Sequence, residues 1–239
     1  MTDPADSARG ATGADGGHRQ ILLLVGAVGS GKGTQAAALS RELGLVSLAS
    51  GNLFRQALRD GTPLGDQARE YMHRGELVPD EITIAMLMDE LAKPAAAAGA
   101  ILDGFPRTVG QARALDATLA EQGEGVRQVF YFDVPTDELV RRVAGRWICP
   151  TCGTPYHDVT NPPRVAGICD KDGTPLVQRD DDRPEVVSAR LAKQVPPMLA
   201  VVDHYDHSGV LTRLDGREPI ESLTEQMLGL LRPTIEARQ

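Results

Sequence analysis

A glycine-rich segment with a single lysine directly follows the first apolar stretch of the chain. It reads Gly26-Ala27-Val28-Gly29-Ser30-Gly31-Lys32-Gly33-Thr34, and it comes after Ile21–Val25 and before an Ala/Gln/Leu-rich stretch. A strand that ends in glycines at a helix N-terminus presents consecutive backbone N–H groups, which hold phosphate. The strict pattern G-x-x-x-x-G-K-[ST] fails by one position, because Gly33 follows the lysine and the hydroxyl arrives at Thr34. We interpret the segment as a polyphosphate-binding loop; the alternative is a glycine-rich turn that binds nothing.

The three cysteines of the chain lie in one short segment. Cys149-x-x-Cys152 is followed, after sixteen residues, by Cys169-x-x-Asp172, and a glycine follows each pair. Two such pairs can curl around one ion, and three thiolates with one carboxylate complete a tetrahedral zinc site. No catalytic histidine or glutamate accompanies the cluster, so the metal would be structural. A disulfide or unligated thiols are the alternatives, and the carboxylate stays open because acidic residues also stand at 170 and 180–182.

Several arginines stand at the ends of expected helices and strands. They are Arg55, Arg107, Arg142, Arg146, Arg179 and Arg190. Arginine pairs with phosphate oxygens through two donors at once, and transfer of a phosphoryl group needs several such cations. For any one of them a solvated surface charge is the alternative. Their placement favours a site, because one follows a strand end and three flank the cysteine segment.

The composition of the whole chain narrows the class of protein. The 239 residues carry a formal net charge of -8, which disfavours a general attraction to nucleic acid or to anionic membrane. No apolar run approaches the roughly 18 residues of a transmembrane helix. Residues 1–19 have no apolar core, so we expect a disordered tail and not a secretory signal. Three clustered cysteines are unlike a secreted disulfide framework, and we expect a cytoplasmic protein.

The phosphate loop and the arginines need a sheet to position them. Buried strands are predicted at Ile21–Val25, Ala100–Leu102, Val129–Val134 and Val210–Leu214. Helices are predicted between and after them, over residues 34–42, 82–91, 108–122, 136–143 and 220–231. This alternation predicts an α/β fold with a central parallel sheet in three layers. Two segments interrupt it: a helical insertion with helices at 52–58 and 64–73, and a turn-rich module around 146–183.

Three weaker signals have plainer interpretations. His204-x-x-His207 has the spacing of metal ligands on a helix, but a solvated helix face explains it as well. Trp147 is expected to serve in packing. The pair Pro196-Pro197 is expected to bend or restart a helix.

Further motifs follow the phosphate loop in a fixed order. They are Ser50-Gly51-Asn52-Leu53-Phe54-Arg55, Gly75-Glu76-Leu77-Val78-Pro79-Asp80-Glu81, Leu102-Asp103-Gly104-Phe105-Pro106-Arg107-Thr108, Gln111, Arg142-x-x-x-Arg146, Tyr156-His157, Asn161-Pro162-Pro163 and Arg179-Asp180-Asp181. With the G-K-G-T ending of the loop, and from about residue 20 to the C-terminus, the chain resembles the adenylate kinases, specifically the long-lid bacterial type with a metal-binding lid. The resemblance implies a magnesium-dependent monomer that transfers a phosphoryl group from ATP to AMP and gives two ADP.

The resemblance also assigns roles to residues. ATP would be bound by Gly29, Ser30, Gly31, Lys32, Gly33, Thr34, Arg142, Arg146, Pro155, Tyr156 and Glu218. AMP would be bound by Ser50, Arg55, Glu76, Leu77, Val78, Gly104, Phe105, Pro106, Arg107, Gln111, Arg179 and Arg190, with Gln111 reading the adenine edge. Catalysis would rest on Lys32, Arg107, Arg146, Arg179 and Arg190, and Asp103 would hold Mg²⁺ through waters. Cys149, Cys152, Cys169 and Asp172 fall on the lid-metal positions.

The resemblance divides the chain into three parts. A phosphate-loop core takes residues 20–48, 79–144 and 183–239, a nucleotide-monophosphate domain takes 49–78, and a lid takes 145–182. The chain departs from the family pattern at Val28, Asn52 and Pro79, where proline, aspartate and a small polar residue are usual. The alternatives are a kinase for another monophosphate or with GTP as donor, and a non-catalytic nucleotide-binding or zinc-ribbon module.

Overall fold

A five-stranded parallel sheet forms the centre of the computed structural model, which describes residues 19–74, 76–179 and 182–231. The strand order is β2 (Val46–Ala49), β3 (Gly99–Asp103), β1 (Gln20–Val25), β4 (Val126–Asp133) and β7 (Leu211–Asp215). All four neighbouring pairs are parallel. Parallel sheets are buried on both faces, which explains why β1 reads as a continuous apolar run. The predicted α/β fold with a central parallel sheet is confirmed.

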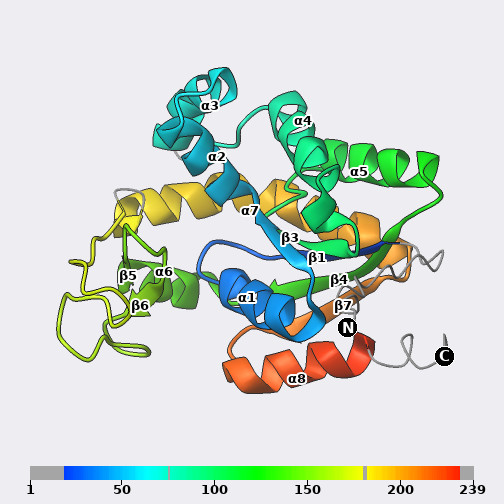
Figure 1. Cartoon of the computed structure of the whole chain (residues 1–239). Coiled ribbons are helices and arrows are strands. Elements are labelled where there is room, and N and C mark those ends of the chain that lie inside the picture. The colour runs from blue at the N-terminus through cyan, green and yellow to red at the C-terminus, as the bar shows by residue number, and fades with distance from the viewer. Residues whose placement is uncertain (1–18, 75, 180–181, 232–239) are drawn as a thin grey trace, which may run out of the picture.

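Helices cover both faces of this sheet (Figure 1). Alternate residues of β1 point to opposite sides, so its side chains divide between two apolar clusters. Leu22 and Leu24 pack with α1 (Lys32–Leu43) and α8 (Ile220–Leu231). Leu23 and Val25 pack with α4 (Asp80–Leu91), α5 (Val109–Glu121) and α7 (Pro184–His207). The result is three layers with the phosphate loop at the carboxyl end of the central strand.

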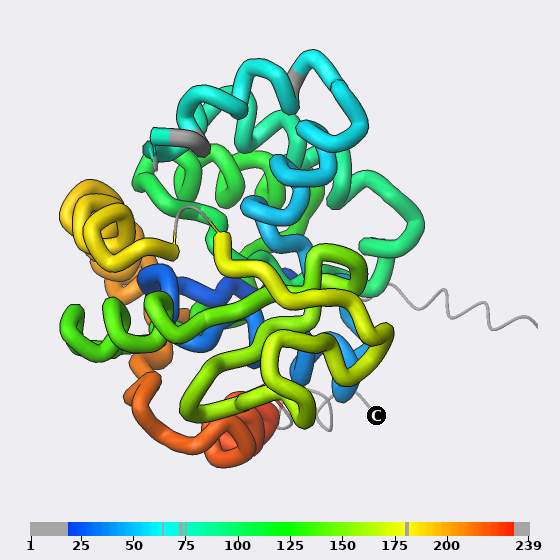
Figure 2. The backbone as a smooth tube through the Cα atoms, turned by 90° about the vertical axis from the view of Figure 1, so that its left-hand side faces the viewer, coloured from blue at the N-terminus to red at the C-terminus, as the bar shows by residue number. Residues whose placement is uncertain are grey.

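Two smaller segments extend from the carboxyl edge of the sheet (Figures 1 and 2). The first holds α2 (Ser50–Arg59) and α3 (Pro63–His73), which pack around Phe54 and Ala68. The second follows α6 (Thr136–Ala144) and holds the antiparallel pair β5 (Arg146–Ile148) and β6 (Pro155–His157). A short 3-10 helix, η1 (Pro94–Ala96), precedes β3.

Each predicted strand and helix is present within a few residues of its expected bounds, but β2, β5, β6 and η1 were not predicted, and no bounds were predicted for α7. The edge strand β2 was not predicted, because four residues with only one fully buried side chain give little periodic signal. Helix α7 is one continuous helix through Pro196 and Pro197, so it does not restart there. The predicted tail lies outside the described residues except for Arg19, and so do Asp180 and Asp181. Within the described part of the chain, no helix is both long and apolar enough to cross a membrane.

The expectation that His204 lies on a solvated helix face is wrong, because its side chain contacts Asp116. Its Nε2 atom lies 2.8 Å from Asp116 Oδ2 on α5, and Tyr205 donates to the other oxygen of Asp116 at 3.1 Å. His207 is exposed and contacts the Asp203 carbonyl of its own helix. The two histidines therefore do not act together, and His204 ties α7 to α5.

Candidate functional site

The glycine-rich segment forms a tight loop between β1 and α1. Gly31 caps α1 with a φ of 92°, and its carbonyl accepts from the backbone N–H groups of Thr34 and Gln35 at 3.1 Å each. A β-carbon on Gly29, whose φ is 85°, would lie 2.7 Å from Val143 Cγ2. The loop thus lies against α6 at a point where only glycine fits, and it leads into the N-terminus of α1, the kind of place where an anion binds.

Lys32 lies across this loop. Its Nζ atom donates to the Ala27 carbonyl at 2.7 Å and to Ser30 Oγ at 3.3 Å. Burial lowers the pKa of Lys32 to about 8. The negative charge of Asp103 opposes this shift, and three positive charges add to it, those of Arg107, Arg146 and Arg190. These five side chains come from four separate segments of the sequence, so the fold concentrates four cations and one carboxylate at one point.

Asp103 ends β3 beside the phosphate loop. It pairs with Leu24 across the parallel ladder between β3 and β1. A β-carbon on Gly33 would lie 3.5 Å from Asp103 Oδ2, so the carboxylate faces the start of α1. A carboxylate in this place, next to bound phosphates, suits a hydrated Mg²⁺ ion, which takes one or two carboxylates and keeps several waters.

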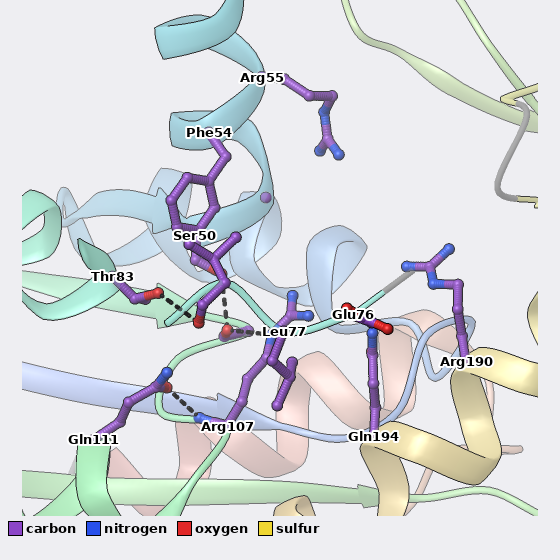
Figure 3. Close-up of a pocket in the computed structure, with 13 residues that line it drawn as sticks. Ser50, Phe54, Arg55, Glu76, Leu77, Thr83, Arg107, Gln111, Arg190 and Gln194 are labelled. Carbon is purple, nitrogen blue, oxygen red and sulfur yellow. Dashed lines mark hydrogen bonds between the residues drawn. The ribbon is translucent and has the colours of Figure 1, made fainter. Parts of the chain in front are cut away.

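A pocket opens next to this charged centre (Figure 3). Its lining contains these predicted AMP-binding residues: Ser50, Arg55, Glu76, Leu77, Val78, Gly104, Arg107, Gln111 and Arg190. It also contains four residues that sequence reasoning missed: Gly51, Phe54, Thr83 and Gln194. Gln194 was within reach of sequence reasoning, because it follows Arg190 by one helical turn and shares its face. Phe105 and Pro106 are buried and do not line the pocket, since Phe105 packs in the main core.

The carbonyl of Gly104 links two side chains that line the pocket. Its carbonyl accepts from Ser50 Oγ at 2.8 Å and from Arg107 Nε at 2.7 Å. With a φ of 72°, it would place a β-carbon 2.9 Å from Arg107 Nη2. Burial lowers the pKa of Arg107 and the charge of Asp103 opposes this, but a guanidinium stays charged in proteins. Arg107 is therefore a fixed positive charge between the pocket and the phosphate loop.

The walls of the pocket carry further charges. Arg55 on α2 and Arg190 on α7 extend toward the same space from opposite sides (Figure 3). Arg55 donates to Asn52 Oδ1 at 2.5 Å. The Glu76 carboxylate accepts from Arg74 Nε at 3.0 Å and lies 3.3 Å from Lys193 Nζ, and hydrogen bonds from these two groups lower its pKa. The pocket therefore suits an anion on its arginine side.

Arg142 and Arg146 stand where α6 passes into the second segment. Arg142 Nε lies 2.7 Å from Glu138 Oε1, and its Nη1 atom donates to the Gly216 carbonyl at 2.8 Å. Arg146 Nε donates to Asp182 Oδ2 at 2.8 Å, and its Nη2 atom bonds the other oxygen of this fully buried carboxylate. Both arginines are thus held by acceptor oxygens of the protein. They lie at the C-terminal end of α6 and just after it.

Other residues that the resemblance assigns to nucleotide binding make contacts within their own segments. Tyr156 is buried, and its hydroxyl lies 3.5 Å from Cys169 Sγ and accepts from the Asp170 amide at 2.7 Å. Its neighbour Pro155 is exposed. The exposed Glu218 accepts from Ser222 at 2.9 Å and from Gln226 at 2.6 Å. The carbonyl of Arg179 accepts from the Asp182 amide at 3.0 Å. The side chains of Tyr156 and Glu218 thus serve their own segments.

The three cysteines and Asp172 form one cluster. One donor atom from each of the four residues lies within 4.8 Å of all the others. Two matching turns build it: the Gly153 amide donates to the Cys149 carbonyl at 3.0 Å, and the Gly173 amide to the Cys169 carbonyl at 2.9 Å. The Sγ atoms of Cys152 and Cys169 are 3.6 Å apart, far beyond the roughly 2.05 Å of a disulfide. That separation suits two thiolates on one tetrahedral ion, since Zn–S bonds of about 2.3 Å place them roughly 3.8 Å apart.

The charges in the cluster favour a cation. A backbone hydrogen bond from Thr174 is the main reason that the pKa of Asp172 lies well below its usual range, so this group is a carboxylate. Burial raises the pKa of Cys149, whose Sγ atom lies 3.3 Å from an Asp172 oxygen. A bound metal would remove the conflict between a buried thiol and a neighbouring carboxylate. The cluster is therefore compatible with a zinc site.

Comparisons with known proteins agree with this geometry. A family model described as "Adenylate kinase" matches residues 24–210. The chain is 44% identical to an adenylate kinase of Oceanobacillus iheyensis, over 88% of this chain and 98% of the relative. It is 46% identical to one of Exiguobacterium sibiricum and 42% identical to one of Staphylococcus aureus, with the same coverage.

Proposed function

The chain belongs to the adenylate kinase family, and we propose that it transfers the terminal phosphoryl group of ATP to AMP in a reversible, magnesium-dependent reaction that gives two ADP. The single observation that carries this proposal is the convergence of charges on Lys32. Arg107 and Arg190 belong to the neighbouring pocket, Arg146 belongs to the second segment, and all three act on Lys32 together with Asp103. A site that must align two phosphate chains needs this arrangement.

The reaction needs alignment and charge neutralisation more than it needs a base. A phosphate oxygen of AMP attacks the γ-phosphorus of ATP as the bond from that phosphorus to the β–γ bridging oxygen breaks. Lys32 and the loop amides would hold the ATP phosphates, and Arg107, Arg190 and Arg55 would hold the AMP phosphate. Arg146 and Arg179 would neutralise charge on the transferring group. Asp103 would hold Mg²⁺ through waters, and that ion supplies further charge neutralisation when bound.

We further propose that the two segments at the sheet edge are the two moving parts of the enzyme. Residues 49–78 would be the nucleotide-monophosphate domain, residues 145–182 the lid, and the remaining described residues the core. Closing of both parts would exclude water, which otherwise competes with AMP for the phosphoryl group. A structural Zn²⁺ on Cys149, Cys152, Cys169 and Asp172 would let the lid move as one rigid unit.

A coupled assay over pairs of donor and acceptor nucleotides tests the reaction. We expect rapid, magnesium-dependent ADP formation from ATP and AMP, and slower turnover with GTP as donor or with other monophosphates as acceptor. Negligible turnover of ATP with AMP, beside rapid turnover of another pair, would contradict the proposal. Nucleotide binding without any turnover would instead favour a non-catalytic nucleotide-binding module.

A matched pair of arginine variants tests the assignment of the site. Arg107→Ala removes a buried cation next to Asp103, and we expect kcat to fall by about 100- to 1,000-fold, the usual effect of losing one such group. Arg113→Ala is the control, because Arg113 is exposed on α5 outside the pocket lining. Equal losses in the two variants would mean that Arg107 has no special place in the reaction.

A further inference from the structure

A carboxylate outside the pocket lining hydrogen-bonds the amide that is predicted to read the acceptor base. Asp80 is the first residue of α4. Its Oδ1 atom accepts from Gln111 Nε2 at 2.8 Å, and its Oδ2 atom accepts from Thr108 Oγ1 at 2.7 Å. Asp80 does not line the pocket, whereas Gln111 does and is only 2% exposed. Asp80 therefore reaches the pocket lining through its hydrogen bond to Gln111.

The other end of the Gln111 amide is held as well. Its Oε1 atom accepts from the backbone N–H of Arg107 at 2.7 Å (Figure 3). A backbone N–H only donates, and an ionised carboxylate only accepts. If the amide turned over, its NH₂ group would face the Arg107 N–H and its oxygen would face the Asp80 carboxylate. The two neighbours of Gln111 thus permit one orientation of the amide and exclude the other.

The backbone around Asp80 is itself fixed. Pro79 precedes α4 with φ −48° and ψ 142°, and the proline ring restricts the φ angle. Its carbonyl accepts from both the backbone N–H and the hydroxyl of Thr83, each at 3.1 Å. On the other side, the Thr108 hydroxyl donates to Asp80 and also caps α5 by accepting from the backbone N–H of Gln111 at 3.1 Å. Asp80 is therefore held from two helices and has little freedom to move away.

The side-chain amide of Gln111, held in this orientation, still has one N–H group and one oxygen lone pair that can bind a ligand. A glutamine amide has two N–H groups and two oxygen lone pairs, and the contacts described above use one of each. Adenine presents an N6–H donor beside the N1 acceptor, and glutamine matches such a pair with both amide atoms. Hypoxanthine and guanine present the opposite pair, O6 as acceptor and N1–H as donor. A glutamine that could turn over would serve either kind of base.

We propose that Asp80 is a positioning residue that sets the choice of acceptor base, because it fixes the orientation of the Gln111 amide. The inference rests on the proposed function, since it concerns how the acceptor of that reaction is selected. A site built to satisfy hydrogen-bonding groups discriminates strongly, because the wrong ligand leaves buried polar groups without partners. Asp80 would thus influence the choice of base without itself contacting the nucleotide.

The test compares AMP with inosine monophosphate, which has nearly the same shape and the reversed edge. Asp80→Asn keeps the shape of the side chain but adds a donor, so one of the two contacts that exclude the turned Gln111 amide is lost and only the Arg107 N–H still opposes it. We expect the ratio of kcat/KM for AMP to that for inosine monophosphate to fall at least tenfold. We also expect the KM for AMP to rise about tenfold, while kcat at saturating AMP and the KM for ATP change less than about threefold.

Glu81→Gln is the matched control. Glu81 is exposed and stands next to Asp80 in the first turn of α4, so its loss removes the same charge from the helix N-terminus. We expect this variant to keep the AMP preference. An unchanged ratio in a folded Asp80→Asn protein, or an equal fall in Glu81→Gln, would overturn the inference and leave Asp80 as a structural residue.

Thr108→Ala covers the case in which Asp80→Asn does not fold. It removes the hydroxyl that orients the Asp80 carboxylate, and we expect the ratio to fall in the same direction, whereas Thr108→Ser should restore it. An unchanged ratio in Thr108→Ala would then overturn the inference. The wild-type protein separates the two proposals: no turnover of AMP contradicts the proposed function, whereas turnover of AMP and inosine monophosphate at equal rates contradicts only the role of Asp80.

Discussion

At the scale of single residues, Lys32 shows how burial prepares a side chain for an anionic ligand. Its pKa of about 8 results from burial first, with three arginines adding to the shift and Asp103 opposing it. Bound phosphates would reverse this balance, because they bring negative charge within contact distance of the ammonium group. The lysine would thus be fully charged when ATP is present and only partly charged above pH 8 when it is absent.

Because ATP binding and protonation of Lys32 are coupled, the affinity for ATP should depend on pH in a defined direction. The free protein loses the Lys32 proton as pH rises through about 8, and the complex keeps it, so ATP binding must take up a proton above that pH. We expect an uptake close to one proton at pH 9, little uptake at pH 7, and an affinity that falls as pH rises. Calorimetry in two buffers of different ionisation enthalpy measures the uptake.

Lys32→Arg is the control for this measurement, because an arginine stays charged in both states. We expect its ATP complex to form at pH 9 without proton uptake. An equal uptake in wild-type and Lys32→Arg protein would assign the proton to another group and contradict our interpretation of Lys32.

At the scale of elements, the cysteine cluster joins two turns that have little else to hold them. The small core of this segment consists of Cys149, Tyr156, Cys169 and Leu176, and so it contains two of the four predicted ligands. The antiparallel pair β5 and β6 is only three residues long on each side. A metal bound at the cluster would therefore contribute much of the stability of this segment.

Removal of the metal should unfold this segment first. We expect a strong chelator, or the substitution Cys149→Ser, to lower the melting temperature by roughly 5–15 °C, which corresponds to the loss of about 2–4 kcal/mol in a chain of this size. The variant should not respond further to the chelator. Differential scanning calorimetry with metal analysis of the same sample checks this. A metal-free sample with an unchanged melting temperature would contradict a structural metal.

Some of these elements and contacts could be predicted from the sequence, and others could not. Strands β1, β3 and β4 were predictable because burial on both faces leaves continuous apolar runs. The three cysteine positions of the cluster were predictable from spacing, since each pair lies on one tight turn, whereas spacing left the carboxylate open and the family resemblance pointed to Asp172. The edge strand β2 and the pocket residue Phe54 were not, because their roles depend on neighbours that are distant in sequence. The link from Asp80 to Gln111 spans 31 residues and leaves no local pattern.

At the scale of the whole molecule, the first segment begins where a strand of the sheet ends, and the second follows a strand through a single helix. Helix α2 starts at Ser50, directly after β2, and the cysteine segment follows β4 through α6. In an open parallel sheet this edge is where ligands bind. Both segments can therefore respond to nucleotides without disturbing the apolar clusters on the two faces of the sheet.

The single tryptophan of the chain offers a reporter for this response. Trp147 is 37% exposed and stands next to Arg146, so it lies in the second segment beside a residue proposed to bind phosphate. We expect ATP to change its emission spectrum, AMP alone to have a much smaller effect, and Arg146→Ala to abolish the response to ATP. A spectrum that stays constant at saturating ATP and AMP would contradict movement of this segment.

Each cation around the site already has a partner within the protein. Lys32 contacts the Ala27 carbonyl, Arg107 the Gly104 carbonyl, Arg142 the Glu138 carboxylate, and Arg146 the Asp182 carboxylate. Binding of a nucleotide is therefore an exchange, in which phosphate oxygens replace resident oxygens, and only the difference between the two contributes to affinity. When the products leave, the same carbonyl and carboxylate oxygens of the protein bind the cations again. An enzyme built in this way gives up some tightness of binding and gains rapid product release, which suits a reaction that must run in both directions.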